Sequence, residues 1–211
     1  MDIHAPDKPV HSIKDFAVHI AIVTVGILIA LGLDGVRESF REHRLLRETR
    51  ENFRQDLQIS HDHMADEMAR VSVGHQKLAA LTAELPTLIQ QHPEQVAARL
   101  EAVKNPNYFF STNAWQAALS TGAVAHMATD EVTNYAWAAE GTKIYVSLQQ
   151  RTMDSEVRAI AFWQAHPHPT ADQAGEGTER ILIFARDEES LAYVAPQTMN
   201  GFNHALASAS R

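Results

Sequence analysis

Hydrophobic positions near the start of the chain form one unbroken run. From Phe16 to Leu33 the sequence reads FAVHIAIVTVGILIALGL, without a Lys, Arg, Asp or Glu. As a helix this run is roughly 27 Å long, close to the ~30 Å hydrocarbon thickness of a bilayer. The pattern predicts a single transmembrane helix over residues 12–36, preceded by a tail over residues 1–11.

Two other interpretations of the run fit less well. A cleaved secretory signal has an apolar region of about 7 to 15 residues, shorter than this one. A helix buried in a soluble core would show a polar face, but only His19 and Thr24 are polar here. A membrane span remains the best interpretation.

The predicted span includes Phe16, Ile20, Gly26, Ala30 and Leu33. Its small residues are spaced so that two such helices could approach closely in lipid, since Gly26 and Ala30 are four positions apart. The expected partners are therefore the lipid bilayer and either a second copy of the chain or another membrane protein.

Beyond the span, a stripe of positions four and three residues apart indicates one face of a long helix. The stripe consists of Leu57, His61, Met64, Met68, Val71, His75 and Leu78. We expect this helix to continue from the span to Pro86, with a break near Gly35 or a kink at Gly74. A face of this width needs a partner helix from the same chain or from a second copy, so the stripe is a possible oligomer seam.

The remaining sequence is also predicted to be helical. Ser111, Thr112 and Asn113 are good residues to begin a short helix, Gly122 follows where that helix should end, and Trp115 is expected to anchor its packing. A long helix from Thr129 to about residue 165 should pack antiparallel to the first, with a row of mostly apolar side chains inward: Val132, Tyr135, Ala139, Val146, Met153, Val157 and Ile160.

The expected fold class is all-α, with one N-terminal transmembrane helix that continues into a helical bundle with long antiparallel helices. The bundle should cover residues 37–165. Residues 166–177, HPHPTADQAGEG, have the composition of a linker. Residues 178–211 should form C-terminal helices that pack on the bundle and are separated by Pro196.

Composition excludes several classes of function. The 211 residues carry a formal net charge of −8, which argues against a nucleic-acid partner because there is no excess of basic surface. The chain has no cysteine, which excludes disulfides, thiolate zinc sites and a cysteine nucleophile.

The charges that flank the span bear on its orientation. Lys8 and Lys14 precede it, whereas five arginines follow it between positions 37 and 50. Since basic residues stay on the cytoplasmic side, the count favours a cytoplasmic bundle over a periplasmic one. The arginines alternate with glutamates, however, so their number also fits simple pairing on a helix surface.

Histidines are the most suggestive candidates for chemistry. His61 and His75 share a face but are about 21 Å apart along a helix, and His63 points elsewhere. None of these residues has the three- or four-residue spacing of a helical metal pair. The chain also lacks the G-x-S-x-G, P-loop and G-x-G-x-x-G motifs. We assign no catalytic, cofactor-binding or metal-binding residue.

Two segments resemble a known family. The pattern HAPDKPVHSIKDFAVHIAIVTVGILIALGLDGVRE is similar to the start of the uncharacterised bacterial membrane proteins of the domain-of-unknown-function family DUF6090. The segment STNAWQAALSTGAVAHM resembles that group's recurring segment, with Trp115 and Gly122 in matching places. The resemblance implies an anchored helical architecture in the bacterial inner membrane, and it implies no activity or catalytic residue.

The expected function is that of a membrane-anchored interaction or scaffold subunit, oligomeric and without catalytic activity. One alternative is a single-pass sensory module that relays ligand binding and would contain a partly apolar cavity. A further alternative is a metal-dependent hydrolase that uses the region between His61 and His75.

Overall fold

The computed structural model describes residues 13–103 and 108–209. Every regular element within them is helical, which confirms the all-α prediction. The long helices are α1 (Ile13–Gln91), α4 (Thr129–Ala165) and α5 (Ala171–Ala209). The shorter elements are η1 (Pro93–Gln95), α2 (Val96–Glu101), α3 (Asn113–Thr121) and η2 (Ala123–His126).

Contacts divide the chain into two units, one ending at Arg47 and the other beginning at Glu48. The first contains the apolar run of α1, whose large side chains are exposed, from 50% at Ile20 to 65% at Leu33. α1 is long and apolar enough near its start to cross a membrane, and no part of its most apolar stretch is buried. The tail predicted for residues 1–11 lies outside the described residues.

α1 continues without a helix break through Gly35, Gly74 and Pro86, so the expected break near Gly35 and the end at Pro86 are wrong. Proline removes a backbone donor and usually ends or bends a helix. Here Leu85 is buried and Leu88 packs against the same core cluster on the other side of Pro86. This packing holds the last turn of α1 in place despite the proline.

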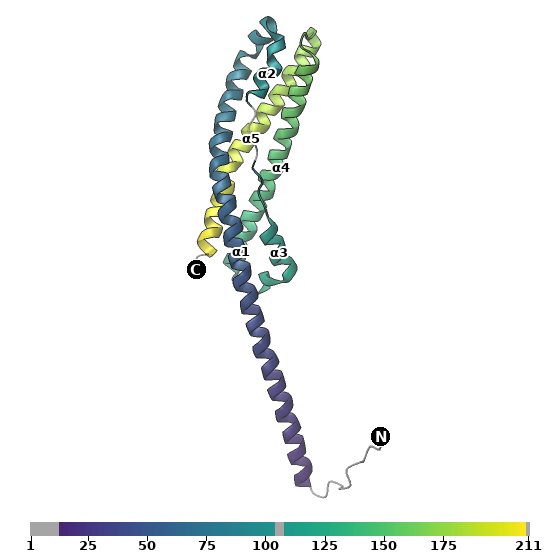
Figure 1. The fold of residues 1–211 in the computed structure, drawn as a ribbon, viewed down its shortest axis with the longest axis vertical. Helices are drawn as coiled ribbons and strands as arrows, with labels where there is room; N and C mark the ends of the chain where they lie inside the picture. Colours follow the sequence, from purple (N-terminus) through teal and green to yellow (C-terminus); the bar gives the residue numbers. More distant parts are fainter. Residues whose placement is uncertain (1–12, 104–107, 210–211) are drawn as a thin grey trace, which may run out of the picture. The chain divides into compact units, whose positions relative to one another are not determined.

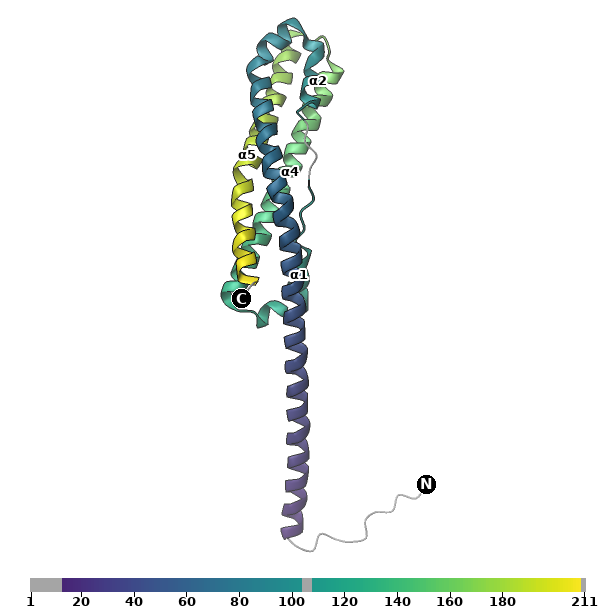
Figure 2. The ribbon, with the colours of Figure 1, turned by 60° about the vertical axis from the view of Figure 1, so that its left-hand side comes forward.

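The second unit is a bundle of three long helices. Figures 1 and 2 show the α4 and α5 helices beside the part of α1 that follows Glu48, with α2 near one end of this bundle and α3 near the other. α4 and α5 run antiparallel and are joined by the short segment His166–Thr170. The antiparallel packing expected for α1 and α4 is wrong, because these two helices run parallel: Arg50 pairs with Glu131, and Glu67, further along α1, bonds to Gln149, further along α4. α2 lies near one end of the bundle and α3 near the other, so α4 begins again at the end where the bundle part of α1 begins, and α5 is the helix antiparallel to both.

Buried positions recur at alternating steps of four and three residues in each long helix of this bundle. On α1 they are Phe53, Leu57, Ser60, Met64, Glu67, Val71, Gly74, Leu78, Leu81 and Leu85. On α4 they include Glu131, Tyr135, Ala138, Thr142, Tyr145, Gln149, Thr152, Glu156, Ala159 and Trp163. On α5 they include Ile181, Phe184, Glu188, Leu191, Ala195, Thr198, Phe202 and Ala205.

The predicted stripe on α1 is half correct. Leu57, Met64, Val71 and Leu78 are buried, but the positions between them are shifted by one residue. His61, Met68 and His75 are only partly buried, whereas Ser60, Glu67 and Gly74 are buried. Hydrophobicity misplaced these positions because small residues and a hydrogen-bonded glutamate fill the interior there. Helices of the same chain cover the stripe, so it needs no second copy.

The inward face predicted for α4 is largely wrong. Tyr135 and Ala139 are buried, but Val146 is 38% exposed, Met153 36% and Val157 57%. The buried face instead carries polar residues such as Gln149 and Glu156. Buried polar groups are tolerated when hydrogen bonds satisfy them, and hydrophobic periodicity does not detect such a face.

The linker predicted for residues 166–177 is too long, because α5 already begins at Ala171. Thr170 and Gln173 form a reciprocal capping box: the Thr170 N–H donates to Gln173 Oε1 (2.9 Å), and the Gln173 N–H donates to Thr170 Oγ1 (3.3 Å). Gly177 then lies against buried Trp163, where an added Cβ would be 2.6 Å from Cζ2 of the indole ring. This glycine therefore serves close packing between α4 and α5.

Pro196 does not separate two C-terminal helices, since α5 runs through it. Near the proline, the Gln197 and Thr198 side chains donate hydrogen bonds to the carbonyls of Tyr193 (3.3 Å) and Val194 (3.2 Å). Thr198 and Ala195 are buried against the rest of the bundle. Packing and these side-chain bonds keep the helix intact across the proline.

Candidate functional site

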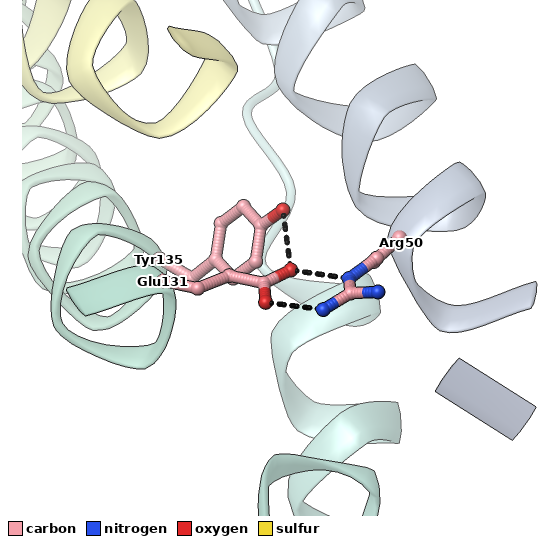
Figure 3. A network of polar contacts seen from close by, with 3 residues as sticks. All are labelled: Arg50, Glu131 and Tyr135. Carbon is pink, nitrogen blue, oxygen red and sulfur yellow. Dashed lines mark hydrogen bonds and ion pairs between the residues drawn. The ribbon is translucent and has the colours of Figure 1, made fainter. Parts of the chain in front are cut away.

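An ion pair fastens α1 to the first turn of α4 (Figure 3). Arg50 Nε donates to Glu131 Oε1 at 2.7 Å, and Arg50 Nη2 donates to Oε2 at 2.8 Å. The Tyr135 hydroxyl donates to Glu131 Oε1 at 3.3 Å. The side chain of Glu131 is 8% exposed and that of Arg50 46%, so only one end of the pair is desolvated. The hydrogen bond to Glu131 raises the pKa of Arg50.

A second polar contact between α1 and α4 is centred on Glu67, which is 2% exposed. The Tyr145 hydroxyl donates to Glu67 Oε1 at 3.2 Å, and Gln149 Nε2 donates to the same oxygen at 3.1 Å. Arg70 lies 3.4 Å from Glu67 Oε2. Burial raises the pKa of Glu67, while these partners act in the opposite direction. Both oxygens of the Glu67 carboxylate thus have a donor or a cation beside them, as a buried carboxylate requires.

Two further glutamates lie near Glu67 around an internal cavity of ≈ 20 Å³. They are Glu156 of α4 and Glu188 of α5, which are 7% and 6% exposed. Burial, followed by the charges of Glu156 and Glu67, raises the pKa of Glu188 to about 7. The bundle thus gathers three carboxyl groups from three helices in its interior.

Aromatic residues of the segment before α3 pack over the same region of α1. The ring of Tyr108 stacks on His63 at 4.7 Å between centroids, and the Arg70 guanidinium lies 3.9 Å from the Tyr108 ring centroid. Phe110 packs edge-on against Tyr145 at 5.3 Å. The segment therefore closes one side of the bundle beside the Glu67 network.

The histidines singled out in the sequence do not come together as a metal site. His61 has a side chain that is 30% exposed and lies 3.1 Å from Asp62. His63 stacks under Tyr108, and His75 is partly buried elsewhere on α1. Among the residues that the structure describes, no three His, Cys, Asp or Glu side chains form a group that could hold a metal ion.

Trp115 and Gly122 lie at the two ends of α3. The Trp115 ring packs against Phe53 of α1 at 6.0 Å between centroids, and Gly122 ends α3 with φ 74°, a left-handed conformation suited to glycine. At the start of α3, Asp56 of α1 accepts hydrogen bonds from the Ala114 N–H and the Ser111 hydroxyl, although burial raises the pKa of Asp56. Trp115 and Gly122 therefore have structural roles: Trp115 packs α3 against α1, and Gly122 ends the helix.

Open grooves mark the surface of α4 and α5. One has a volume of ≈ 1010 Å³, and its lining mixes basic residues such as Arg151 and Arg158 with acidic residues such as Glu179 and Asp187. The other has a volume of ≈ 810 Å³ and is lined by residues that include Trp137, Ile144, Val194 and Gly201. Trp137 is 75% exposed and Ile144 48%, an unusual display of apolar surface.

In the first unit, Gly26 has open space around it, with nothing within 4 Å of an added Cβ. The five representative span positions, Phe16, Ile20, Gly26, Ala30 and Leu33, are all exposed. Their side chains are therefore available to lipid or to another helix.

Comparison with known proteins adds no relative: no family model, curated protein or solved structure matches the chain.

Sequence reasoning missed the polar interior of the bundle. Glu67 lies three residues after Met64 and four before Val71, which is the spacing of the buried stripe. On α4, Tyr145, Gln149, Thr152 and Glu156 follow the same three-and-four spacing. This shared periodicity is the signal that could have identified them, but only if polar residues had been allowed to occupy interior positions.

Proposed function

We propose that this chain is a membrane-anchored helical interaction subunit without catalytic activity, which assembles with itself or with another membrane protein. The observation that carries the proposal is the exposed apolar groove between α4 and α5, with Trp137 75% exposed. Aromatic residues at such positions commonly anchor protein interfaces.

The interior of the bundle supports the same proposal over a sensory one. A ligand sensor needs a cavity of several hundred cubic ångströms. Two small cavities in the described part of the bundle, one beside Phe53 and one beside Glu67, measure ≈ 20 Å³ each, room for about one water molecule. The larger openings, of ≈ 1010 and ≈ 810 Å³, are the grooves on the outside of α4 and α5. The hydrolase hypothesis gains no support from the placement of His61 and His75.

The proposed location is the bacterial inner membrane, with one span near the N-terminus and the bundle in the cytoplasm. The exposed apolar segment from Phe16 to Leu33 supports anchoring, and the arginines after the span support the cytoplasmic orientation. Gly26 and Ala30 provide a second candidate contact through the span itself. Fusion of a fluorescent reporter and of alkaline phosphatase to the C-terminus would test the orientation.

The test of self-assembly is the mass of the full-length chain in detergent, measured by light scattering. We expect an oligomer in the wild type and a lower mass for Trp137→Lys, because a charge would have to be buried in the contact. Val157→Lys is the matched control, since Val157 is an exposed apolar residue of α4 outside both grooves. A monomeric wild type would contradict self-assembly.

A photo-crosslinking amino acid at position 137 extends the test to other partners in cells. The proposal expects adducts from position 137 and none from position 157. If neither position forms an adduct, the α4–α5 groove is not an interaction surface and the proposed function fails.

A further inference from the structure

We propose that Glu188, which faces Glu67 and Glu156 across the small internal cavity, is a proton-binding site that makes the stability of the bundle depend on the surrounding pH. This inference goes beyond the interaction function and does not rest on it, because it concerns only the interior of the second unit.

The first argument is geometric. Glu67, Glu156 and Glu188 come from α1, α4 and α5, and each occupies a buried position of its helix with 2%, 7% and 6% exposure. The cavity they line measures ≈ 20 Å³, so at most about one water molecule fits between them. Two or three negative charges in this space would lack the solvent needed to screen them.

The carboxyl groups differ in the contacts that stabilise their charged forms. Glu67 accepts hydrogen bonds from Tyr145 and Gln149 and lies 3.4 Å from Arg70, which together stabilise its charged form. At Glu188 only burial and the charges of Glu156 and Glu67 act, and no hydrogen bond favours ionisation. Compared with Glu67, Glu188 is therefore the group that holds the proton.

The other charged groups nearby do not stabilise the ionised form of Glu188. From α1 it meets Glu67, whose own cationic neighbour, Arg70, is engaged with Glu67 and with the Tyr108 ring. From α4 it meets Tyr145 and Glu156. On α5 the adjacent Asp187 is paired with Arg151 at 2.9 Å. The rest of the cavity lining includes apolar Val71, Phe184 and Leu191.

The proton balance sets the direction of the effect. In the folded bundle burial raises the pKa of Glu188 from its usual 4.5 to about 7, so the side chain stays neutral at pH values where an unfolded chain would already be ionised. A group with a raised pKa stabilises the fold fully below the unfolded value and loses this contribution as pH rises through the folded value. Between pH 4.5 and about 7 unfolding therefore releases a proton to solvent, and stability falls as pH rises; above about 7 the folded bundle itself holds a Glu188 carboxylate that repels Glu67 and Glu156.

The experiment uses the full-length chain in lipid nanodiscs, with thermal unfolding followed by circular dichroism at pH 5 and pH 8. We expect the Tm of the wild type to fall by about 5–10 °C over this interval. Glu188→Gln should lose clearly less, because its neutral amide no longer titrates. Glu189→Gln, an exposed glutamate on the same helix, should behave like the wild type. An equal fall in Glu188→Gln and wild type would overturn the proposal.

Infrared spectroscopy of the wild type provides a second test in case Glu188→Gln does not fold. A protonated carboxyl group has its own carbonyl band, which should be present at pH 6, disappear by pH 8 and be missing from folded Glu188→Gln. Absence of this band from the wild type at pH 6 would also overturn the proposal. The oligomer mass of Glu188→Gln reports on the proposed function separately, so the two ideas can fail independently.

Discussion

Residues 16–33 and residues 53–85 belong to the same helix, α1, yet their apolar side chains have opposite surroundings. In the first segment apolar residues are continuous and exposed, as at Leu28 with 62% exposure. In the second they recur every three or four residues and are buried, as at Leu78 with 1%. The comparison teaches that a helix with apolar residues on every side can be surrounded by lipid. A helix whose apolar residues recur every three or four positions instead packs one face against other helices.

The largest expected effect is a loss of packing in the second segment only. Leu78→Ala should lower the free energy of unfolding of the bundle by about 2–5 kcal/mol, because it leaves a cavity in the cluster with Leu81 and Trp163. Leu28→Ala makes the same chemical change at an exposed position and should leave bundle unfolding unchanged. Urea titration of both variants in nanodiscs measures this. Equal losses would show that the two segments do not differ as described.

An added positive charge should be more harmful in the first segment of α1 than in the second. Val25→Arg places a cation near the middle of the apolar run and should disfavour membrane insertion by about 2.5–3.5 kcal/mol. Val73→Arg changes a residue of the second segment that is 47% exposed and should leave insertion intact. Membrane fractionation and alkaline extraction distinguish the two outcomes. Retention of Val25→Arg in the membrane would argue against a span at this place.

The smallest effect should come from a histidine of the predicted stripe. His75 is only partly buried, so His75→Leu should change the free energy of unfolding by about 0.5 kcal/mol or less. The measurement is again urea unfolding, with the neighbouring exposed Gln76→Leu as the control. A large loss on His75→Leu alone would mean that this imidazole makes a specific buried contact.

How much of the fold could be predicted depended on whether local signals and packing agreed. The helix end at Gly122 was correct because glycine tolerates the left-handed conformation found there. The long linker before residue 178 was wrong because Gly175 and Gly177 have the composition of a loop. At Gly177 the residue instead allows α5 to approach Trp163, a contact invisible without the partner helix.

The candidate site was less predictable than the fold. A glutamate in a helix is usually solvated surface, so Glu67 and Glu188 gave no local sign of burial. Their roles arise because Tyr145, Gln149 and Glu156, which are distant in sequence from Glu67, lie opposite it in the bundle. The spacing of three and four residues was present on all three helices, but a search for apolar residues passes over the polar residues at some of these positions.

The sequence alone determined that the chain is helical and that its first long helix begins with a segment apolar enough to span a membrane. Both follow from local properties, the absence of polar breaks in one segment and the periodicity of the other. Tertiary structure alone decided which residues between Leu57 and Leu78 face inward, that α4 buries a polar face, and that Glu188 meets Glu67 and Glu156. These outcomes depend on what packs opposite each residue, and a single helix carries no record of its neighbours.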